Sequence, residues 1–389
     1  MDKVKSKTPK LRFPEFKMDW EIKIFKNIVK LQRGSSPRPI VKYITKSEDG
    51  VNWIKIGDAV NGKSYIDSTE ERITKEGAKK SRRVKIGEII LSNSMSYGKP
   101  YILNIEGYIH DGWFVIREYE DNFNKQYLLQ VLGSEWIQKQ YSRLAAGGVV
   151  HNISSELVNS VKVNLPPKQE QQKIASFLTA VDDKIQQLTK KKEVLKKYKK
   201  GVMQKIFSQE IRFKDDNGNE YPDWEKKKLK TISIKKSSSI SANTLEENTG
   251  DFIVYGASGA LKKIDYYTEE NNYIAIVKDG AGVGRTFLCE PKTSVLGTMD
   301  IIRPREKINL YFLYLLLNQI KMKKFITGST IPHIYYKDYS TEKAKCPVLA
   351  EQNKIADFLS SIDKKIDSVN TQVEKTKEFK KGLLQQMFV

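Results

Sequence analysis

The side chains that could do chemistry are few, and their spacing supports no familiar active site. His110, His151 and His333 have no serine, cysteine or acidic partner at a spacing that pairs a nucleophile with its base. Cys289 and Cys346 are isolated, and with three histidines they cannot supply a four-ligand zinc site of standard spacing. Clustered carboxylates of the nuclease type do not stand out either. We therefore expect a chain that is not an enzyme and that binds neither metal nor cofactor itself.

A glycine-rich run, Gly280-Ala-Gly-Val-Gly284, invites comparison with phosphate-binding loops. Such loops open a helix, whose N-terminal amides and dipole hold the phosphate. Here the Gly-Lys-Ser/Thr ending is missing, and Arg285 to Cys289 have the composition of a strand. We therefore predict a turn between two strands. Its flanking Lys278 and Arg285 make it a candidate for contact with DNA.

Basic and hydrogen-bonding loops carry the remaining chemistry. Arginine, lysine, serine and asparagine side chains can bond base edges or phosphates, and backbone amides at glycines reach phosphates. For any single position, a solvated loop side chain is an equally good explanation. The candidate DNA-binding residues are Arg33, Ser35, Ser36, Arg38, Lys55, Asn93, Tyr97, Lys99, Arg143, Asn152, Lys278, Arg285, Ser329, Thr330, His333 and Tyr335.

The charge of the chain indicates a polyanionic partner. The 389 residues carry a formal net charge of +21, with 39% hydrophobic and 10% aromatic residues, which is typical of a folded protein. Each phosphate that lysine or arginine neutralises releases counterions, so nucleic acid is the favoured partner. A membrane surface is the alternative, but residues 1–10 contain no amphipathic or lipidated anchor, and no signal peptide is recognisable. We expect a cytoplasmic protein.

An internal repeat organises the sequence. Residues 170–207 align with 351–388 at a constant offset of 181, and 17 of the 38 positions are identical. A weaker echo links Leu11-Arg-Phe13, before Trp20, with Ile211-Arg-Phe213, before Trp224. The order is therefore start, domain, helix, start, domain, helix.

Each copy of the repeat predicts a long helix with a coiled-coil seam. Apolar residues recur every seven positions, and Pro166-Pro167 and Pro347 mark the helix starts. About 40 residues at 1.5 Å per residue give a rod of roughly 60 Å. One apolar seam is unstable alone, so the two copies should pack on each other, most simply antiparallel. The seam residues are Ile174, Phe177, Val181, Ile185, Leu188, Ile355, Phe358, Ile362, Ile366 and Val369.

Between the helices lie two segments rich in short β-branched and aromatic runs, such as 113–116, 273–277 and 299–302, followed by helical stretches near 125–141 and 310–324. The fold class is therefore α+β, with two mixed α/β domains joined by two long helices packed as an antiparallel coiled coil.

The motif Glu-Gln-x-Lys-Ile-Ala-x-Phe-Leu at 170–178 and again at 351–359 resembles the specificity subunit of type I restriction–modification systems. The resemblance covers essentially the whole chain. Stretches 33–37, 53–58 and 252–256 are also similar to that family's target recognition domains. It implies an N-terminal segment near the C-terminal helix (1–19), recognition domain 1 (20–164), a central helix (165–209), a connecting segment (210–223), recognition domain 2 (224–346) and a C-terminal helix (347–389).

The resemblance implies that each domain reads one half of a split double-stranded DNA site and that the helices set the spacer. It also implies two methyltransferase subunits docked on the helices, which use S-adenosylmethionine, and two restriction subunits, which use ATP and Mg. Two other hypotheses stay open: a basic coiled-coil scaffold that binds DNA without sequence specificity, and a stand-alone nuclease or methyltransferase.

Overall fold

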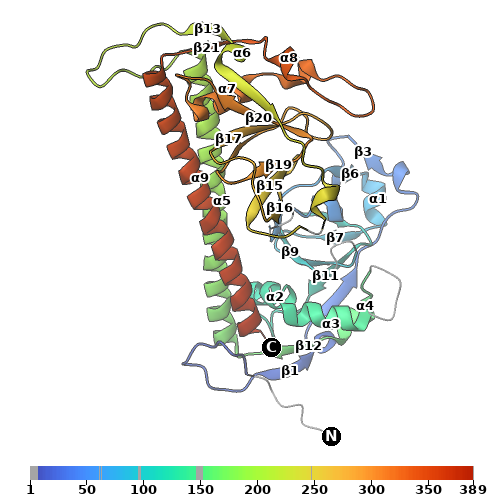
Figure 1. The fold of residues 1–389 in the computed structure, drawn as a ribbon. Helices are drawn as coiled ribbons and strands as arrows, with labels where there is room; N and C mark the ends of the chain where they lie inside the picture. Colours follow the sequence, from blue (N-terminus) through green and yellow to red (C-terminus); the bar gives the residue numbers. More distant parts are fainter. Residues whose placement is uncertain are drawn as a thin grey trace. The chain divides into compact units, whose positions relative to one another are not determined.

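The computed structural model describes residues 8–60, 62, 64–94, 98–145, 152–246 and 248–388. The chain divides into two compact units. Unit 1 comprises the described parts of residues 1–190 and 371–389, and unit 2 those of 191–370. The long helices α5 (Lys168–Ser208) and α9 (Leu349–Met387) therefore each contribute one half to either unit (Figure 1). Among the described residues, none of the helices combines the length and apolarity that crossing a bilayer requires.

Unit 1 is built around a five-stranded sheet in the order β2-β11-β8-β9-β5, antiparallel except for β5 against β9. A second sheet has the order β3-β6-β4-β10-β7, and β1 pairs with β12. The strands are β1 (Glu21–Ile24), β2 (Lys30–Arg33), β3 (Ile44–Thr45), β4 (Val51–Ile54), β5 (Tyr65–Ile66), β6 (Glu71–Ile73), β7 (Arg82–Val84), β8 (Ile89–Ser92), β9 (Pro100–Leu103), β10 (Gly107–Ile109), β11 (Trp113–Arg117) and β12 (Lys162–Leu165). The shorter helices are α1 (Lys75–Lys79), α2 (Lys125–Leu132), α3 (Glu135–Ala145) and α4 (Ser155–Ser160), with 3-10 turns η1 (Phe25–Asn27), η2 (Ile40–Lys42) and η3 (Ile56–Asp58).

Unit 2 has a four-stranded antiparallel sheet in the order β14-β20-β17-β18, a three-stranded sheet β16-β15-β19 and the pair β13-β21. Its strands are β13 (Glu225–Lys228), β14 (Ser233–Ser237), β15 (Phe252–Gly256), β16 (Gly259–Ile264), β17 (Tyr273–Val277), β18 (Thr286–Cys289), β19 (Ser294–Val295), β20 (Met299–Pro304) and β21 (Lys343–Cys346). Its shorter helices are α6 (Leu229–Ile232), α7 (Leu310–Gln319) and α8 (Tyr336–Tyr339), with η4 (Asn243–Leu245) and η5 (Met322–Phe325).

The two central sheets have the same strand order. β2-β11-β8-β9 in unit 1 matches β14-β20-β17-β18 in unit 2, strand for strand. The match extends to single hydrogen bonds: the amide of Ile153 donates to the carbonyl of Asn93, and that of Ile334 donates to Lys278, each at 2.9 Å. The sequence repeat is therefore a structural duplication of whole units, although residues within the sheets have diverged.

The helical stretches predicted near 125–141 and 310–324 are both interrupted. The first ends as α2 at Gly133 and continues as α3, while the second ends as α7 and continues only as η5. Asn124 and Asn309 cap α2 and α7, because each side-chain oxygen accepts backbone N–H bonds of the first turn.

The long helices begin one and two residues after the predicted prolines, and they run antiparallel. In unit 2, Lys192 contacts Asn370 at 2.5 Å and Lys199 contacts Asp363 at 2.6 Å. In unit 1, Lys380 contacts Asp182 at 2.7 Å. Partner numbers on α9 thus fall as those on α5 rise, which confirms the expected antiparallel direction.

Most predicted seam residues are buried in the structure. Ile174, Val181, Leu188, Ile355, Ile362, Ile366 and Val369 are all at most 9% exposed, and Ile185 packs partly buried against the unit 1 core. Phe177 and Phe358 differ from the prediction. Phe177 is 36% exposed and meets Phe13 edge-on, while Phe358 meets Phe213 in the same way. Both rings pack on the start segments rather than in the seam between the long helices. A helix that contacts both its partner helix and a start segment needs apolar residues on more than one face.

A buried glutamate in the first turn of each long helix fixes the start segment of its unit. Glu170 accepts from Arg12 at 2.7 and 2.9 Å, and Glu351 accepts from Arg212 at 3.2 and 2.9 Å. Both carboxylates are fully buried, and Glu351 also accepts from the indole of Trp224 at 3.0 Å. Bidentate guanidinium pairing satisfies a carboxylate that would otherwise be costly to bury.

The next residue ties each helix to the domain before it. Gln171 accepts from the amide of Asn124 at 2.8 Å and donates to the carbonyl of Asn122. Gln352 accepts from the amide of Asn309 at 2.9 Å in the same way. The two residues of the repeated Glu-Gln pair therefore have distinct roles, since the glutamate holds the start segment and the glutamine holds the cap of α2 or α7.

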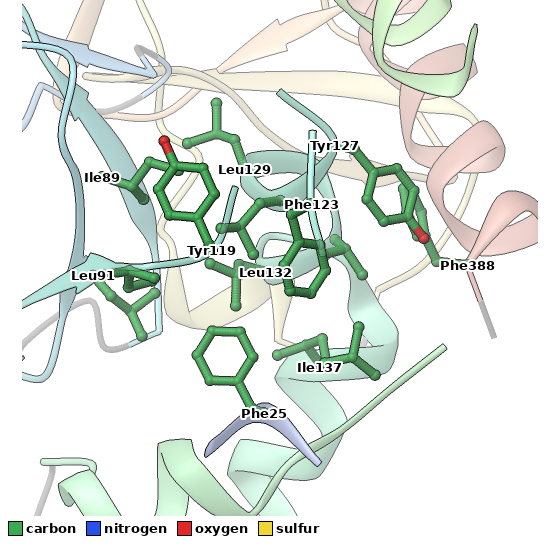
Figure 2. Packing of buried hydrophobic residues seen from close by; sticks show 14 of the residues in the cluster. Phe25, Ile89, Leu91, Tyr119, Phe123, Tyr127, Leu129, Leu132, Ile137 and Phe388 are labelled. Carbon is green, nitrogen blue, oxygen red and sulfur yellow. The ribbon is translucent and has the colours of Figure 1, made fainter. Parts of the chain in front are cut away.

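The unit 1 core joins the sheet, the short helices and the end of α9. Phe25, Ile89, Leu132 and Ile137 belong to one buried cluster (Figure 2). The centroid of the Tyr127 ring lies 5.6 Å from that of Phe388. In unit 2, Phe207 and Phe312 stack at 5.8 Å in the equivalent place. Each domain thus packs on an aromatic residue near the end of a long helix.

Replacing Glu351 by glutamine should destabilise the protein strongly. The change removes the fully buried carboxylate of the pair and leaves the half-buried Arg212 with the fully exposed Asp223 as its remaining acidic partner, a loss of about 3 kcal/mol in the free energy of unfolding. Urea unfolding of the full chain measures it. The matched control is Glu374→Gln on the same helix, whose pair with Lys377 is more than half exposed and should contribute less than about 1 kcal/mol. Equal effects of the two substitutions would contradict the anchoring role.

Candidate nucleic-acid interface

The candidate loops of unit 1 gather at one end of the central sheet. Arg33 ends β2 and pairs with Phe114 at the start of β11, and Ser92 ends β8 opposite Trp113. The loop after β2, the β8–β9 connection and the turn before β11 therefore leave the sheet on the same side. Residues from 152 onward join them, since the amide of Ile153 donates to Asn93.

Asp111, in the turn before β11, binds four of the predicted residues. Its carbonyl accepts from Arg33 at 3.0 Å and from Asn93 at 2.8 Å. Its carboxylate accepts from Ser36 at 2.7 Å and lies 3.5 Å from Arg38. Residues drawn from two separate loops are thus held at one point by a single turn.

The electrostatics of this turn favour a charged aspartate beside a neutral histidine. Burial alone would raise the pKa of the Asp111 carboxyl, but the Ser36 hydrogen bond and the nearby charges outweigh it and hold the pKa below its usual value. Burial lowers the pKa of His110, with Asp111 partly opposing the shift. Near neutral pH the turn therefore carries one negative charge, which lies 3.5 Å from the guanidinium of Arg38.

Gly34 allows the first loop to lie against this turn. A Cβ at that position would come within 2.0 Å of the carbonyl oxygen of His110, so any side chain would push the loop away. The amide of Gly34 donates to the carbonyl of Trp113 at 2.8 Å. The glycine in the 33–37 motif is needed for close backbone approach.

The other predicted residues of unit 1 differ in what they can reach. Asn93 is 2% exposed, so its role here is to fix the loop. Lys55 is held by Glu71 at 2.6 Å, and the hydroxyl of Ser35 donates to the carbonyl of Lys80. Tyr97 lies outside the described residues. The exposed positions are Arg33, Arg38, Lys99, Arg143 and Asn152.

The candidate loops of unit 2 are joined through their backbones. The amide of Gly280 donates to the carbonyl of Pro332 at 2.8 Å, and Thr327 and His333 exchange two backbone bonds. Arg285 donates to the carbonyl of Ala257, in the turn between β15 and β16. Segments 278–285, 327–335 and the tip of a hairpin therefore form one composite surface.

The glycine run is the turn between β17 and β18, as predicted. The two strands pair antiparallel, and Gly280, Gly282 and Gly284 all have φ between 83° and 88°, a region that favours glycine. A strand follows, so no helix N-terminus is present there for a phosphate.

Around this turn the side chains are mostly exposed. Arg285, Ser329, Thr330 and Tyr335 are exposed, and the ring of His333 lies 4.9 Å from that of Tyr335. Lys278 is half-buried, 3.6 Å from the buried carboxylate of Asp300. The arrangement offers cations, hydroxyls and one aromatic face, a set suited to phosphates and base edges.

The described residues contain no group of three or more potential metal ligands among histidine, cysteine, aspartate and glutamate. Both cysteines are buried and reduced, and burial raises the pKa of Cys289 to about 12 and that of Cys346 to about 11. Their thiols are therefore protonated and packed in the core.

Sequence reasoning missed the residues that assemble these surfaces. Asp111 gathers the loops of unit 1, and Asp300 lies 3.6 Å from Lys278 at the base of the glycine turn of unit 2. Isolated aspartates beside a histidine or within an apolar strand carry no local signal. The one available hint is that Asp300 interrupts the apolar run Met299-Asp-Ile-Ile302, because a charge inside a strand needs a partner.

Comparison with known proteins places the chain in a family. The family described as "Type I restriction modification DNA specificity domain" matches residues 17–197 and 221–377. A putative type I restriction enzyme MjaX specificity subunit from Methanocaldococcus jannaschii is 27% identical, covering 96% of this chain and 94% of its own. The MjaIX specificity subunit from the same organism is 24% identical over 94% and 92% of the two chains.

Solved structures agree on the fold. The S subunit of a type I restriction-modification system from M. genitalium superposes with a TM-score of 0.65 at 17% identity, covering 98% of this chain and 99% of that chain. A chain from a structural study of type I R-M complex assembly gives 0.57 at 16% identity, covering 95% and 97%. The duplicated α/β fold with its two long helices is shared with these proteins, and the chain belongs to the type I restriction–modification DNA specificity family.

Proposed function

We propose that this chain is the sequence-specificity subunit of a type I restriction–modification enzyme and that each unit reads one half of a bipartite DNA site. The observation that carries the proposal is the matched pair of sheets, each ending in a different set of exposed basic and polar loops. A repeated scaffold with two unlike reading surfaces fits an asymmetric, two-part target. The net charge of +21 supplies the general attraction to the phosphate backbone.

The catalytic steps belong to partner subunits in this proposal. Two methyltransferase subunits would dock on the long helices and transfer methyl groups from S-adenosylmethionine to DNA. Two restriction subunits would use ATP and Mg. The chain itself is a cytoplasmic, non-catalytic component whose ligand is double-stranded DNA. If instead it were a stand-alone methyltransferase, the purified chain would transfer label from the methyl donor to DNA; we expect no transfer.

We also propose that the long helices set the distance between the half-sites. A continuous helix of 41 residues has a length of roughly 60 Å, and Lys192–Asn370, Lys199–Asp363 and Lys380–Asp182 hold it in one register against α9. Such a pair is stiff, whereas a flexible linker would accept many spacings. Two modules that read one face of a duplex must sit a defined number of base pairs apart.

A heptad inserted into both helices should lengthen the spacer and leave the half-sites unchanged. Inserting seven residues after Glu193 and seven after Ser368 extends both helices at facing positions. The added length is about 10 Å, or about three base pairs. Sequencing of methylated sites in cells that carry the modification subunits measures the spacer. An equal insertion in the exposed turn at 216–218 is the control and should change nothing; altered half-sites with an unchanged spacer would contradict the proposal.

Single arginines at the two reading surfaces should affect different half-sites. Arg285→Ala should reduce base discrimination in one half-site by about tenfold, and Arg33→Ala in the other, the range expected for one arginine contact to a base. Arg305→Ala is the matched control, because Arg305 follows the opposite end of β20 and also contacts a backbone carbonyl. Methylation-site sequencing provides the readout. Identical effects of Arg285→Ala and Arg305→Ala would place the reading surface elsewhere.

Salt dependence separates specific reading from a basic scaffold. Affinity for any duplex should fall by several orders of magnitude between about 50 and 200 mM salt, as phosphate contacts require. In complex with the modification subunits, the preference for the methylated sequence over a scrambled duplex should persist across that range. A preference close to one at every salt concentration would favour the non-specific scaffold.

A further inference from the structure

The outer edge of β21 in unit 2 carries free backbone groups. β13 and β21 pair antiparallel, and the amide of Leu229 donates to the carbonyl of Glu342. This bond determines which residues of β21 direct their backbone groups toward β13. By the alternation of an antiparallel ladder, the N–H and C=O groups of Lys343 and Lys345 point away from β13. Among the described residues, no hydrogen bond meets the outward backbone groups of Lys343.

In unit 1 the equivalent edge is closed. Gln140 of α3 donates to the carbonyl of Lys162 at 2.9 Å and accepts from its amide at 2.9 Å. The hydroxyl of Tyr127 donates to the carbonyl of Asn164 at 3.2 Å. Lys162 and Asn164 correspond to Lys343 and Lys345 at the repeat offset of 181.

Unit 2 lacks both closing groups. Phe312, which has no hydroxyl, stands where Tyr127 stands, and after α7 the chain forms the short η5 in place of the eleven-residue α3. A pocket of about 350 Å³ occupies this place, with Lys343, Ala344 and Lys345 along one wall. The ring of Phe207 is half-buried there, whereas its counterpart Phe388 is only 4% exposed.

The pocket combines an apolar floor with a positive rim. Leu316, Ile320 and Phe207 provide apolar surface. Lys321 and Lys343 are exposed at the rim, and the carboxylate of Glu342 is already paired with Lys324 at 2.5 Å. A duplex is too wide to enter a pocket of this size, and its phosphates gain nothing from an apolar floor or a strand edge.

We propose that this pocket binds an extended acidic segment of a protein partner, which adds to the free edge of β21 as a further strand. Backbone groups of the segment would bond the N–H and C=O of Lys343, as strand addition requires. Its apolar side chains would contact Phe207 and Ile320, and its carboxylates the lysines of the rim. Because α3 closes the matching edge of unit 1, the proposal places the site at the β21 edge of unit 2 and not at the matching edge of unit 1. Binding at this edge is independent of the proposed reading of DNA.

The test uses the full-length chain and a fluorescein-labelled octapeptide of alternating leucine and aspartate, followed by fluorescence anisotropy. The wild-type chain should bind the peptide, and the double variant Lys321→Glu/Lys343→Glu should bind it about tenfold more weakly or worse, because two attractive charges become repulsive. Lys162→Glu, at the equivalent but closed edge of unit 1, is the matched control and should bind like the wild type. Urea unfolding establishes that both variants are folded.

Two further probes define the mode of binding. A peptide with lysine in place of aspartate should not bind, and one methylated on its internal backbone nitrogens should bind weakly, because it keeps its side chains but lacks N–H donors for the edge. Equal binding of the methylated peptide, or an unchanged affinity of the double variant, would overturn the proposal. Displacement of the peptide by a non-cognate DNA duplex from the wild type, but not from the double variant, would also overturn the proposal, because the pocket would then be a DNA-binding site.

Discussion

Two buried carboxylates, Glu170 and Glu351, are the constraint on which both units depend. Each lies in the first turn of a long helix, fully removed from solvent, and each must therefore be matched by an arginine from a segment far away in the sequence. Because the arginine precedes the domain and the glutamate follows it, one ion pair closes the domain at its base. The adjacent Gln171 and Gln352 extend the closure to the caps of α2 and α7. A domain anchored at these two points keeps a fixed orientation on its helix.

This anchoring explains why the helix motif repeats while the sheets diverge. The Glu-Gln pair, the aspartates Asp182 and Asp363, and the aromatic residues near the helix ends are each used in the same way in both units. Apart from the recurring backbone bonds of Ile153 and Ile334, the loops at the other end of the sheets are held by different partners in the two units. Asp111 organises the loops of unit 1 through side chains, whereas the loops of unit 2 are joined mainly through backbone bonds. One scaffold can therefore carry different loops without loss of its fold.

The two units differ at the outer edges of β12 and β21. An eleven-residue helix covers the edge of β12, but a single 3-10 turn leaves that of β21 open. Exposed strand edges attract other chains, and proteins normally cover them or protect them with lysine. Here lysines line the edge beside an apolar pocket, a combination that discourages neutral strands and favours an acidic one. A duplicated scaffold can in this way carry a site in one unit that the other unit does not share.

The sequence by itself determined the two long helices and their repeat. It also determined that 280–284 is a turn between two strands and that the chain is strongly basic. These features are local or periodic, so their physical causes lie within a few turns of helix or a single hairpin. Only the tertiary structure decided which loop residues meet. Asn93 reads as a base-contacting side chain in the sequence but is buried against Asp111, and Phe177 fits the heptad yet packs on Phe13. The identical order of the two central sheets was equally hidden, because strand pairing joins residues that are distant in the chain and depends on burial and register rather than on residue identity.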